Sequence, residues 1–278
     1  MHANRLFLVS LSGFALALAN PVFAQAPAAT PGPTYADLAT LADGTPMVIH
    51  AQILRQITLP PERAPNVAPG HVRLYIEAQT QALLLGNAPI GAALHYLVDV
   101  PFDARGKPPK LKKEEVILFA RPVAGRPDQV QLVKPDAQLL WSPALAEKLK
   151  PILAAFAAPN SPPAITGVSD ALSTPGNLTG ESDTQIFLTT ADGDPAALSI
   201  VRRPNMAPHW GVSWTELVDQ SAKPAEPDTL EWYRLACGLP STLPDSANLA
   251  QDPRDRAQAQ SDYRFVLDQL GPCKRNRG

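Results

Sequence analysis

The chain is poor in the residue types that carry most catalytic and metal-binding chemistry. Among 278 residues it has two cysteines, five histidines and 6% aromatic residues. No two histidines have the close spacing of a zinc motif such as HExxH, and neither a CxxC pair nor a Gly-x-Ser-x-Gly nucleophile motif occurs. We therefore identify no catalytic residue from the sequence, and we predict no metal site and no cofactor.

A dominant charge and long apolar runs are also lacking. The chain has 24 basic and 26 acidic residues, which gives a net charge of −2 at pH 7. A general nucleic-acid-binding surface needs excess positive charge to neutralise phosphates, so we do not expect nucleic acid as a partner. The short basic run at 274–277 is predicted to be a solvated chain end.

The first 24 residues are the most informative segment. His2 and Arg5 give a cationic start, residues 6–19 form an apolar run, and Val22-Phe23-Ala24 offers a small-x-small cleavage pattern. The run is shorter than the roughly 20 residues of a membrane-spanning helix, and no later run approaches that length. Residues 1–24 are therefore predicted to be a signal peptide. Its removal would leave a periplasmic or secreted protein with no membrane span.

An even number of cysteines in an exported chain indicates a disulfide. A bridge between Cys237 and Cys273 would close a loop of about 36 residues, which stabilises a fold by about 4 kcal/mol in chain-entropy models. A redox-active or nucleophilic thiol is the alternative. The disulfide is favoured because neither cysteine has a nearby histidine or a CxxC partner.

Proline, in contrast, is abundant, with 31 residues. Because proline breaks helix interiors and cannot donate to a β-ladder, we expect short elements joined by many turns. Residues 25–36, rich in alanine, proline and threonine, are predicted to be a disordered leader. Two domains are expected after the leader, at 37–141 and 142–278.

The first of these domains is predicted to be a β-domain. Period-two alternation is clearest at 71–85, where apolar residues from Val72 onward alternate with polar residues from Arg73 onward. Further strands are expected at 47–58, 93–100, 115–121, 130–133 and 138–141. This spacing predicts a small antiparallel barrel or sandwich, with an OB-like barrel favoured. OB-folds usually carry a helix between strands three and four. The prolines within 101–109 argue against that helix, so the sequence predicts a reduced barrel or another sandwich.

The second domain is predicted to be α+β, which makes the whole chain α+β and β-rich. A helix is expected over 142–158, with Ser142 as its N-cap and a kink at Pro151. An antiparallel meander should follow, with strands at 184–190, 197–203 and 210–214.

Two more helices are expected to pack on this meander. The first should begin at a capping box formed by Asp228 and Glu231. The second should be capped by Asp252 and end at Gly271. The predicted disulfide would join the ends of these two helices.

Four aromatic residues gather in the second domain and form its candidate ligand surface: Trp210, Trp214, Trp232 and Tyr233. Aromatic platforms bind sugars or peptides because a flat apolar face needs little side-chain ordering. Packing in the core is the favoured interpretation, since Trp210 and Trp214 share a predicted strand face with Val212.

Three stretches, at 176–185, 230–240 and 262–273, resemble segments of uncharacterised exported proteins of Gram-negative alphaproteobacteria. The resemblance implies an envelope protein with a paired cysteine. It implies no activity.

Export, a β-rich organisation and the lack of a catalytic motif together favour a non-enzymatic binding or assembly module of the periplasm or envelope. Its ligand is unknown, and an envelope protein or a glycan is the expected partner. The alternative is a secreted hydrolase that acts on cell-wall or extracellular polymers. A third hypothesis is metal handling by His50, His71 and His95, although three separate exposed histidines are the favoured interpretation.

Overall fold

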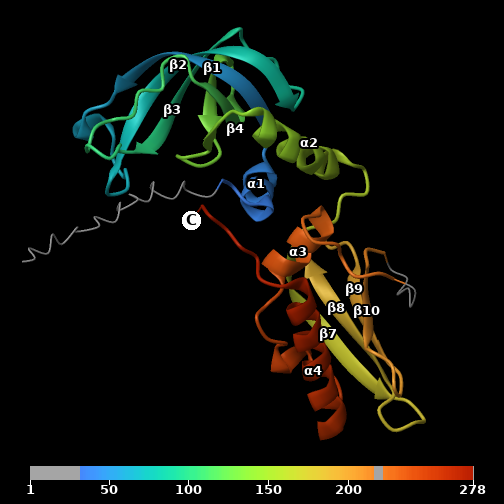
Figure 1. Cartoon of the computed structure of the whole chain (residues 1–278). Helices are drawn as coiled ribbons and strands as arrows, with labels where there is room; N and C mark the ends of the chain where they lie inside the picture. The colour runs from blue at the N-terminus through green and yellow to red at the C-terminus, as the bar shows by residue number, and fades with distance from the viewer. Residues whose placement is uncertain (1–31, 216–221, 278) are drawn as a thin grey trace, which may run out of the picture. The chain divides into compact units, whose positions relative to one another are not determined.

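A computed structural model describes residues 32–215 and 222–277. The predicted signal peptide at 1–24 and leader residues 25–31 lie outside the described residues. The fold is α+β and strand-rich, as predicted, and Figure 1 shows its two sheets and four labelled helices. In chain order the helices and strands are α1 (Tyr35–Ala42), β1 (Met47–Thr58), β2 (His71–Leu85), β3 (Ala93–Pro101), β4 (Glu115–Val123), β5 (Arg126–Leu132), β6 (Gln138–Leu140), α2 (Pro143–Ala157), β7 (Ile165–Pro175), β8 (Ser182–Thr190), β9 (Ala196–Arg202), β10 (His209–Ser213), α3 (Leu230–Gly238) and α4 (Pro253–Leu270).

The first sheet closes into a five-stranded barrel. Its ring runs β1-β2-β3-β5-β4 and returns to β1, while β6 adds to β4 outside the ring. All pairs in the ring are antiparallel except β3–β5, which is parallel. The prediction of a small barrel is therefore confirmed, but the barrel is not antiparallel throughout, because β3 and β5 run parallel.

The alternation in β2 explains why this strand can form a barrel wall. Val72, Leu74 and Ile76 are buried, whereas the residues between them are partly exposed, as the period-two pattern predicts. The β1–β2 pairing also contains three register shifts. Such bulges bend a strand and increase its twist, which lets these long strands wrap around a small core.

The second sheet has the order β10-β9-β8-β7 and is antiparallel throughout. Helices α3 and α4 pack on it and bury side chains such as Ile186 and Leu198. The sequence predicts three of its strands. It misses β7, because the serine, threonine and glycine residues of this segment weaken the apolar alternation. The domain boundary at 141 stays a prediction, but the strands on its two sides do form separate sheets.

Two predictions about helix starts need correction. The predicted leader ends too late, because Thr34 caps α1 and forms a capping box with Asp37. Pro151 lies inside α2, which runs without interruption from residue 143 to 157, and the kink at this proline stays a prediction. Helix α3 is capped by Thr229 rather than Asp228, since the Thr229 hydroxyl accepts the N–H of Trp232 at 3.2 Å.

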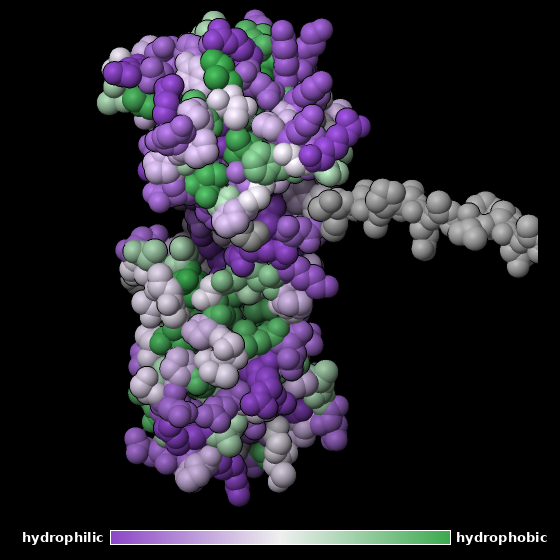
Figure 2. All heavy atoms as spheres, turned by 90° about the vertical axis from the view of Figure 1, so that its left-hand side faces the viewer, coloured by the Kyte–Doolittle hydropathy of each residue, from purple (hydrophilic) through white to green (hydrophobic). Residues whose placement is uncertain are grey.

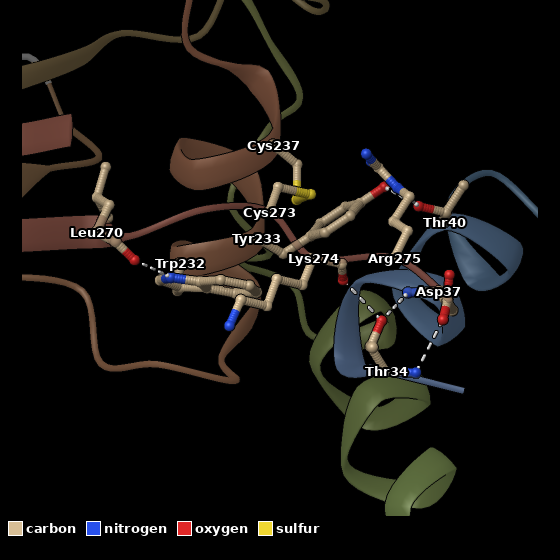
Figure 3. Close-up of a disulfide and its surroundings, with 10 residues drawn as sticks. All are labelled: Thr34, Asp37, Thr40, Trp232, Tyr233, Cys237, Leu270, Cys273, Lys274 and Arg275. Atoms are coloured by element: carbon tan, nitrogen blue, oxygen red, sulfur yellow. Dashed lines mark hydrogen bonds between the residues drawn. A yellow bond between two sulfur atoms is a disulfide. The ribbon is translucent and has the colours of Figure 1, made fainter. Parts of the chain in front are cut away.

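The two cysteines form the predicted disulfide, with the Cα atoms of Cys237 and Cys273 5.1 Å apart. Cys237 lies in the last turn of α3. Gly271, at φ 70°, ends α4 and sends the chain toward the bridge. Figure 3 shows the bridge beside α1 and the segment that follows Cys273.

That segment is bound to the protein, which corrects the prediction of a solvated basic tail. The Thr34 hydroxyl donates to the carbonyl of Lys274 at 2.9 Å, as Figure 3 shows. The backbone N–H groups of Asn276 and Arg277 donate to the Asp37 carboxylate at 3.0 and 3.1 Å. Arg277 also reaches Asp136, which lies between β5 and β6. The sequence run alone could not show that a buried carboxylate receives the tail.

The pKa of Asp37 makes this tail contact dependent on pH. Burial alone would raise that pKa, but hydrogen bonds from the backbones of Thr34, Asn276 and Arg277 lower it below 3.8. A carboxyl that is more acidic in the folded protein stabilises the fold above its unfolded pKa. That stabilisation is lost as the pH falls through the folded pKa.

We expect Asp37→Asn to lower the free energy of unfolding by about 1–2 kcal/mol at pH 7, because charge-assisted hydrogen bonds are lost. The difference in free energy of unfolding between the native protein and the variant should become smaller below about pH 4, where the native carboxyl becomes protonated. Urea unfolding of both proteins at pH 7 and pH 3 measures this difference. An equal difference at the two pH values would contradict the assigned role of the ionised Asp37.

Candidate functional site

A groove of about 630 Å³ opens on the outside of the barrel, over β2, β3, β4 and β5. The side chains that give it chemical character are Arg73, Tyr75, His95, Asp99, Arg121 and Lys134. Alternation places the first four of these on the outer faces of β2 and β3, opposite the buried residues that fill the barrel. The groove is therefore built on rigid strands.

The seam between β3 and β5 is uneven along the groove. His95 pairs with Gln129, and the N–H of Asp99 donates to the carbonyl of Pro135 at 2.7 Å. From the first link to the second, the chain advances four residues along β3 but six residues on the β5 side. The two extra residues are accommodated in the bends and turn at 133–136, because β5 ends at Leu132.

A buried ion pair fixes one part of the groove. The Arg73 guanidinium donates to both carboxylate oxygens of Asp99, each at 2.7 Å, and also to the carbonyl of Pro65. The hydrogen bond with Asp99 raises the pKa of Arg73. Since the two charges neutralise each other in a bidentate contact, this pair gives the groove shape rather than net charge.

A stacked aromatic pair forms a second part of the groove. The rings of Tyr75 and His95 lie nearly parallel, at 14°, with centroids 5.9 Å apart. The His95 ring also lies 3.6 Å from a carboxylate oxygen of Asp128. Such a stack presents a flat surface whose orientation is already fixed before a ligand arrives.

Two cations give the groove its net charge. Arg121 of β4 and Lys134, just after β5, are both exposed. Neither forms an ion pair or side-chain hydrogen bond within the part of the chain that the structure describes. Gln131, the register partner of Arg121, adds a neutral amide beside it. This arrangement suits an anion that lies against the Tyr75–His95 stack.

The four aromatic residues of the predicted ligand surface lie elsewhere. Trp210, Trp232 and Tyr233 have relative exposures of 3%, 8% and 8%, and Trp214 is half-buried. The Trp232 indole donates to the carbonyl of Leu270 at 2.8 Å, and the Tyr233 hydroxyl bonds to Thr40. These rings therefore pack into the core, which is the interpretation that the shared strand face of Trp210 and Val212 favours.

The structure does not bring His50, His71 and His95 together. His50 stacks on Trp141 and bonds to Glu115 at 2.8 Å, while His71 contacts the carbonyl of Pro69. Within 32–215 and 222–277, no group of three His, Cys, Asp or Glu side chains has a metal-binding arrangement. The metal-handling hypothesis thus gains no support from geometry.

The groove itself was not predicted from the sequence. Alternation in 71–85 does place Arg73 and Tyr75 on one face, which is the available signal. The identity of the partner strands depends on strand order and register. The same holds for the lack of a side-chain partner at Arg121 and Lys134 within the described part of the chain.

Comparisons with known proteins add no assignment. No protein-family model matches the chain, and no curated protein matches it significantly. Among the described residues, no helix is both long and apolar enough to cross a membrane.

Proposed function

We propose that the chain is an exported, non-enzymatic envelope protein whose barrel groove binds an acidic glycan. The proposal rests on one observation. Arg121 and Lys134, two cations that have no side-chain partner among the described residues, line the same groove as the Tyr75–His95 stack. The cations would contact carboxylates of the glycan, and the stack would pack against a sugar ring.

The barrel topology supports this proposal. We assign it as OB-like, because its ring order is β1-β2-β3-β5-β4 with a parallel closure between β3 and β5. In OB-folds, the face of strands two and three binds oligosaccharides and oligonucleotides. The groove uses this face. The loop between β3 and β4 contains no helix among its described residues, which is a departure from the usual OB-fold.

The proposed location outside the cytoplasm also supports glycan binding. Disulfides persist in oxidising compartments, so the Cys237–Cys273 bridge agrees with the proposed signal peptide at 1–24. The proposed location, in the periplasm or outside the cell, brings the groove into contact with envelope glycans.

The chemistry of the groove favours binding over hydrolysis. Asp99 is the one carboxylate among the residues that line it, and both of its oxygens accept hydrogen bonds from Arg73. Glycoside hydrolysis generally uses two carboxyl groups that flank the scissile bond. We therefore retain the secreted hydrolase only as the weaker proposal.

A calorimetric titration with linear tetragalacturonate tests the proposal. We expect binding to the native protein, and a loss of affinity of about tenfold to a hundredfold when Arg121→Gln and Lys134→Gln are combined. Tyr75→Ala should weaken binding of the acidic sugar without changing its salt dependence, since the ring contributes no charge.

Lys112→Gln is the matched control, because Lys112 is an exposed cation of the same barrel that does not line the groove. It should bind like the native protein. Equal weakening by the control, or equal affinity for uncharged galactotetraose, would contradict a charge-selective groove. Tighter binding of a single-stranded oligonucleotide would contradict the glycan assignment.

A further inference from the structure

A second cavity, of about 670 Å³, lies between α1, α2, α3 and the segment after the disulfide. Its apolar walls include Tyr35, Leu38, Ile152, Ala155 and Trp232. This volume is typical of small-molecule sites, which are concave and mostly apolar with a few polar groups. In the space-filling view of Figure 2, apolar residues form separate patches among hydrophilic residues and residues of intermediate hydropathy.

The aromatic walls of this cavity are held in place. The rings of Tyr35 and Trp232 meet edge to face at 80°, with centroids 6.2 Å apart. The hydrogen bond from the Trp232 indole to Leu270 leaves the faces of the ring for apolar contact. The cavity can therefore receive a hydrocarbon chain without reordering these side chains.

Two lysines supply positive charge at the cavity. Lys148 of α2 and Lys274 of the tail both line it and are exposed. Neither ammonium group has a hydrogen-bond or ion-pair partner among the described residues. Figure 3 shows the side chain of Lys274 running alongside the Trp232 ring. One carboxylate, Asp228, also lines the cavity, so the charged groups sum to one net positive charge.

The tail wall of the cavity is fixed by contacts on both sides of Lys274. Cys273 precedes Lys274 and is bridged to α3. The carbonyl of Lys274 accepts a hydrogen bond from the Thr34 hydroxyl.

Burial, with smaller contributions from Asp228 and Tyr233, raises the pKa of Tyr35 to about 12. The Tyr35 hydroxyl therefore stays protonated near neutral pH and can donate to an anion.

We propose that this cavity binds a single-chain anionic amphiphile, specifically a long-chain carboxylate. The hydrocarbon chain packs between Tyr35, Trp232 and the apolar face of α2, and the carboxylate lies near Lys148 and Lys274. The site is separate from the barrel groove, and no part of this proposal depends on glycan binding.

Titration of the disulfide-bonded protein with dodecanoate, followed by calorimetry, tests this site. We expect affinity to rise about fourfold for each added methylene between octanoate and dodecanoate, as burial of hydrocarbon requires. Dodecyltrimethylammonium, with the same chain and the opposite charge, should bind at least tenfold more weakly.

Three variants separate the contributions of charge and shape. Lys148→Gln combined with Lys274→Gln should weaken dodecanoate binding about tenfold or more, whereas Lys150→Gln, an exposed cation of α2 that does not line the cavity, should leave it unchanged. Asp228→Asn should strengthen binding several-fold by removing the one repulsive charge. Asparagine tolerates the positive φ of 56° at this position, so the backbone should be preserved.

Ala155→Trp should abolish binding by filling the cavity while it leaves both lysines in place. Equal binding of the cationic amphiphile would overturn the proposal. Binding that survives Ala155→Trp, or that is unchanged by Asp228→Asn, would overturn it as well. None of these results bears on glycan binding by the barrel groove, so either proposal can be overturned without the other.

Discussion

Replacing Asp262 with alanine is expected to lower the free energy of unfolding by about 3 kcal/mol. Asp262 of α4 has a relative exposure of 0% and accepts hydrogen bonds from three side chains. Arg202 Nε and the Thr184 hydroxyl donate to it at 2.5 Å, and Gln258 donates at 2.9 Å. Its removal leaves the Thr184 hydroxyl with Ser173 as its remaining acceptor, but it deprives the partly buried guanidinium of Arg202 of its carboxylate partner, which is costly.

Asp183→Ala is the matched control for this effect. Asp183 lies in β8 of the second sheet. Like Asp262 it pairs with an arginine, Arg203, at 2.8 Å, but 46% of the Asp183 side chain is exposed. Exposed ion pairs contribute only about 0–1 kcal/mol. Urea unfolding of the native protein and of the two variants measures both values. If Asp262→Ala costs no more than Asp183→Ala, the buried network does not hold α4 on the second sheet.

Removal of the disulfide should have an effect of similar size. The bridge joins residues 36 positions apart, and chain-entropy models assign a loop of this length about 4 kcal/mol. The double change Cys237→Ser and Cys273→Ser also releases the covalent anchor of the tail that contacts Thr34 and Asp37. We therefore expect a lower unfolding midpoint together with freer access to the tail.

Urea unfolding with and without dithiothreitol measures the first effect, and limited trypsin digestion followed by mass spectrometry measures the second. Reduced native protein should resemble the double serine variant, which itself should not respond to dithiothreitol. Cleavage after Lys274 and Arg275 should become faster in both. An unchanged midpoint and unchanged cleavage on reduction would show that the bridge neither stabilises the fold nor anchors the tail.

Much of the barrel could be predicted because its strands carry strong local signals. The strand predicted at 71–85 has the bounds of β2, and its buried and exposed residues alternate over 71–78. The apolar run at 116–120 is buried in β4, which pairs with neighbours on both sides. Asp252 and Gly271 likewise bound α4 as predicted, since both act through the backbone of the same few residues.

The helix features that the sequence analysis did not predict have physical reasons. Asp228 and Thr229 are both good N-cap residues, but Asp228 has a positive φ and the N–H of Trp232 donates to Thr229. Helix α1 has eight residues, too short for a convincing apolar period, although Thr34 and Asp37 do stand at capping-box spacing.

The candidate site could not be predicted because it depends on pairing between distant segments. Arg73 meets Asp99, and His95 pairs with Gln129, only once the strand order and the parallel β3–β5 closure are known. That Arg121 and Lys134 have no side-chain partner within residues 32–215 and 222–277 is likewise a property of the folded chain. The aromatic cluster predicted from the sequence, in contrast, does not line the barrel groove: its rings pack into the core, and Trp232 also lines the second cavity.

Mapping of backbone amide chemical shifts during a titration with tetragalacturonate tests the central claim most directly. We predict saturable shifts at Tyr75, His95, Arg121, Gln131 and Lys134, with little change in β7–β10. The absence of shifts at these positions, or shifts centred on the second sheet, would contradict the assignment of the barrel groove as the glycan-binding site.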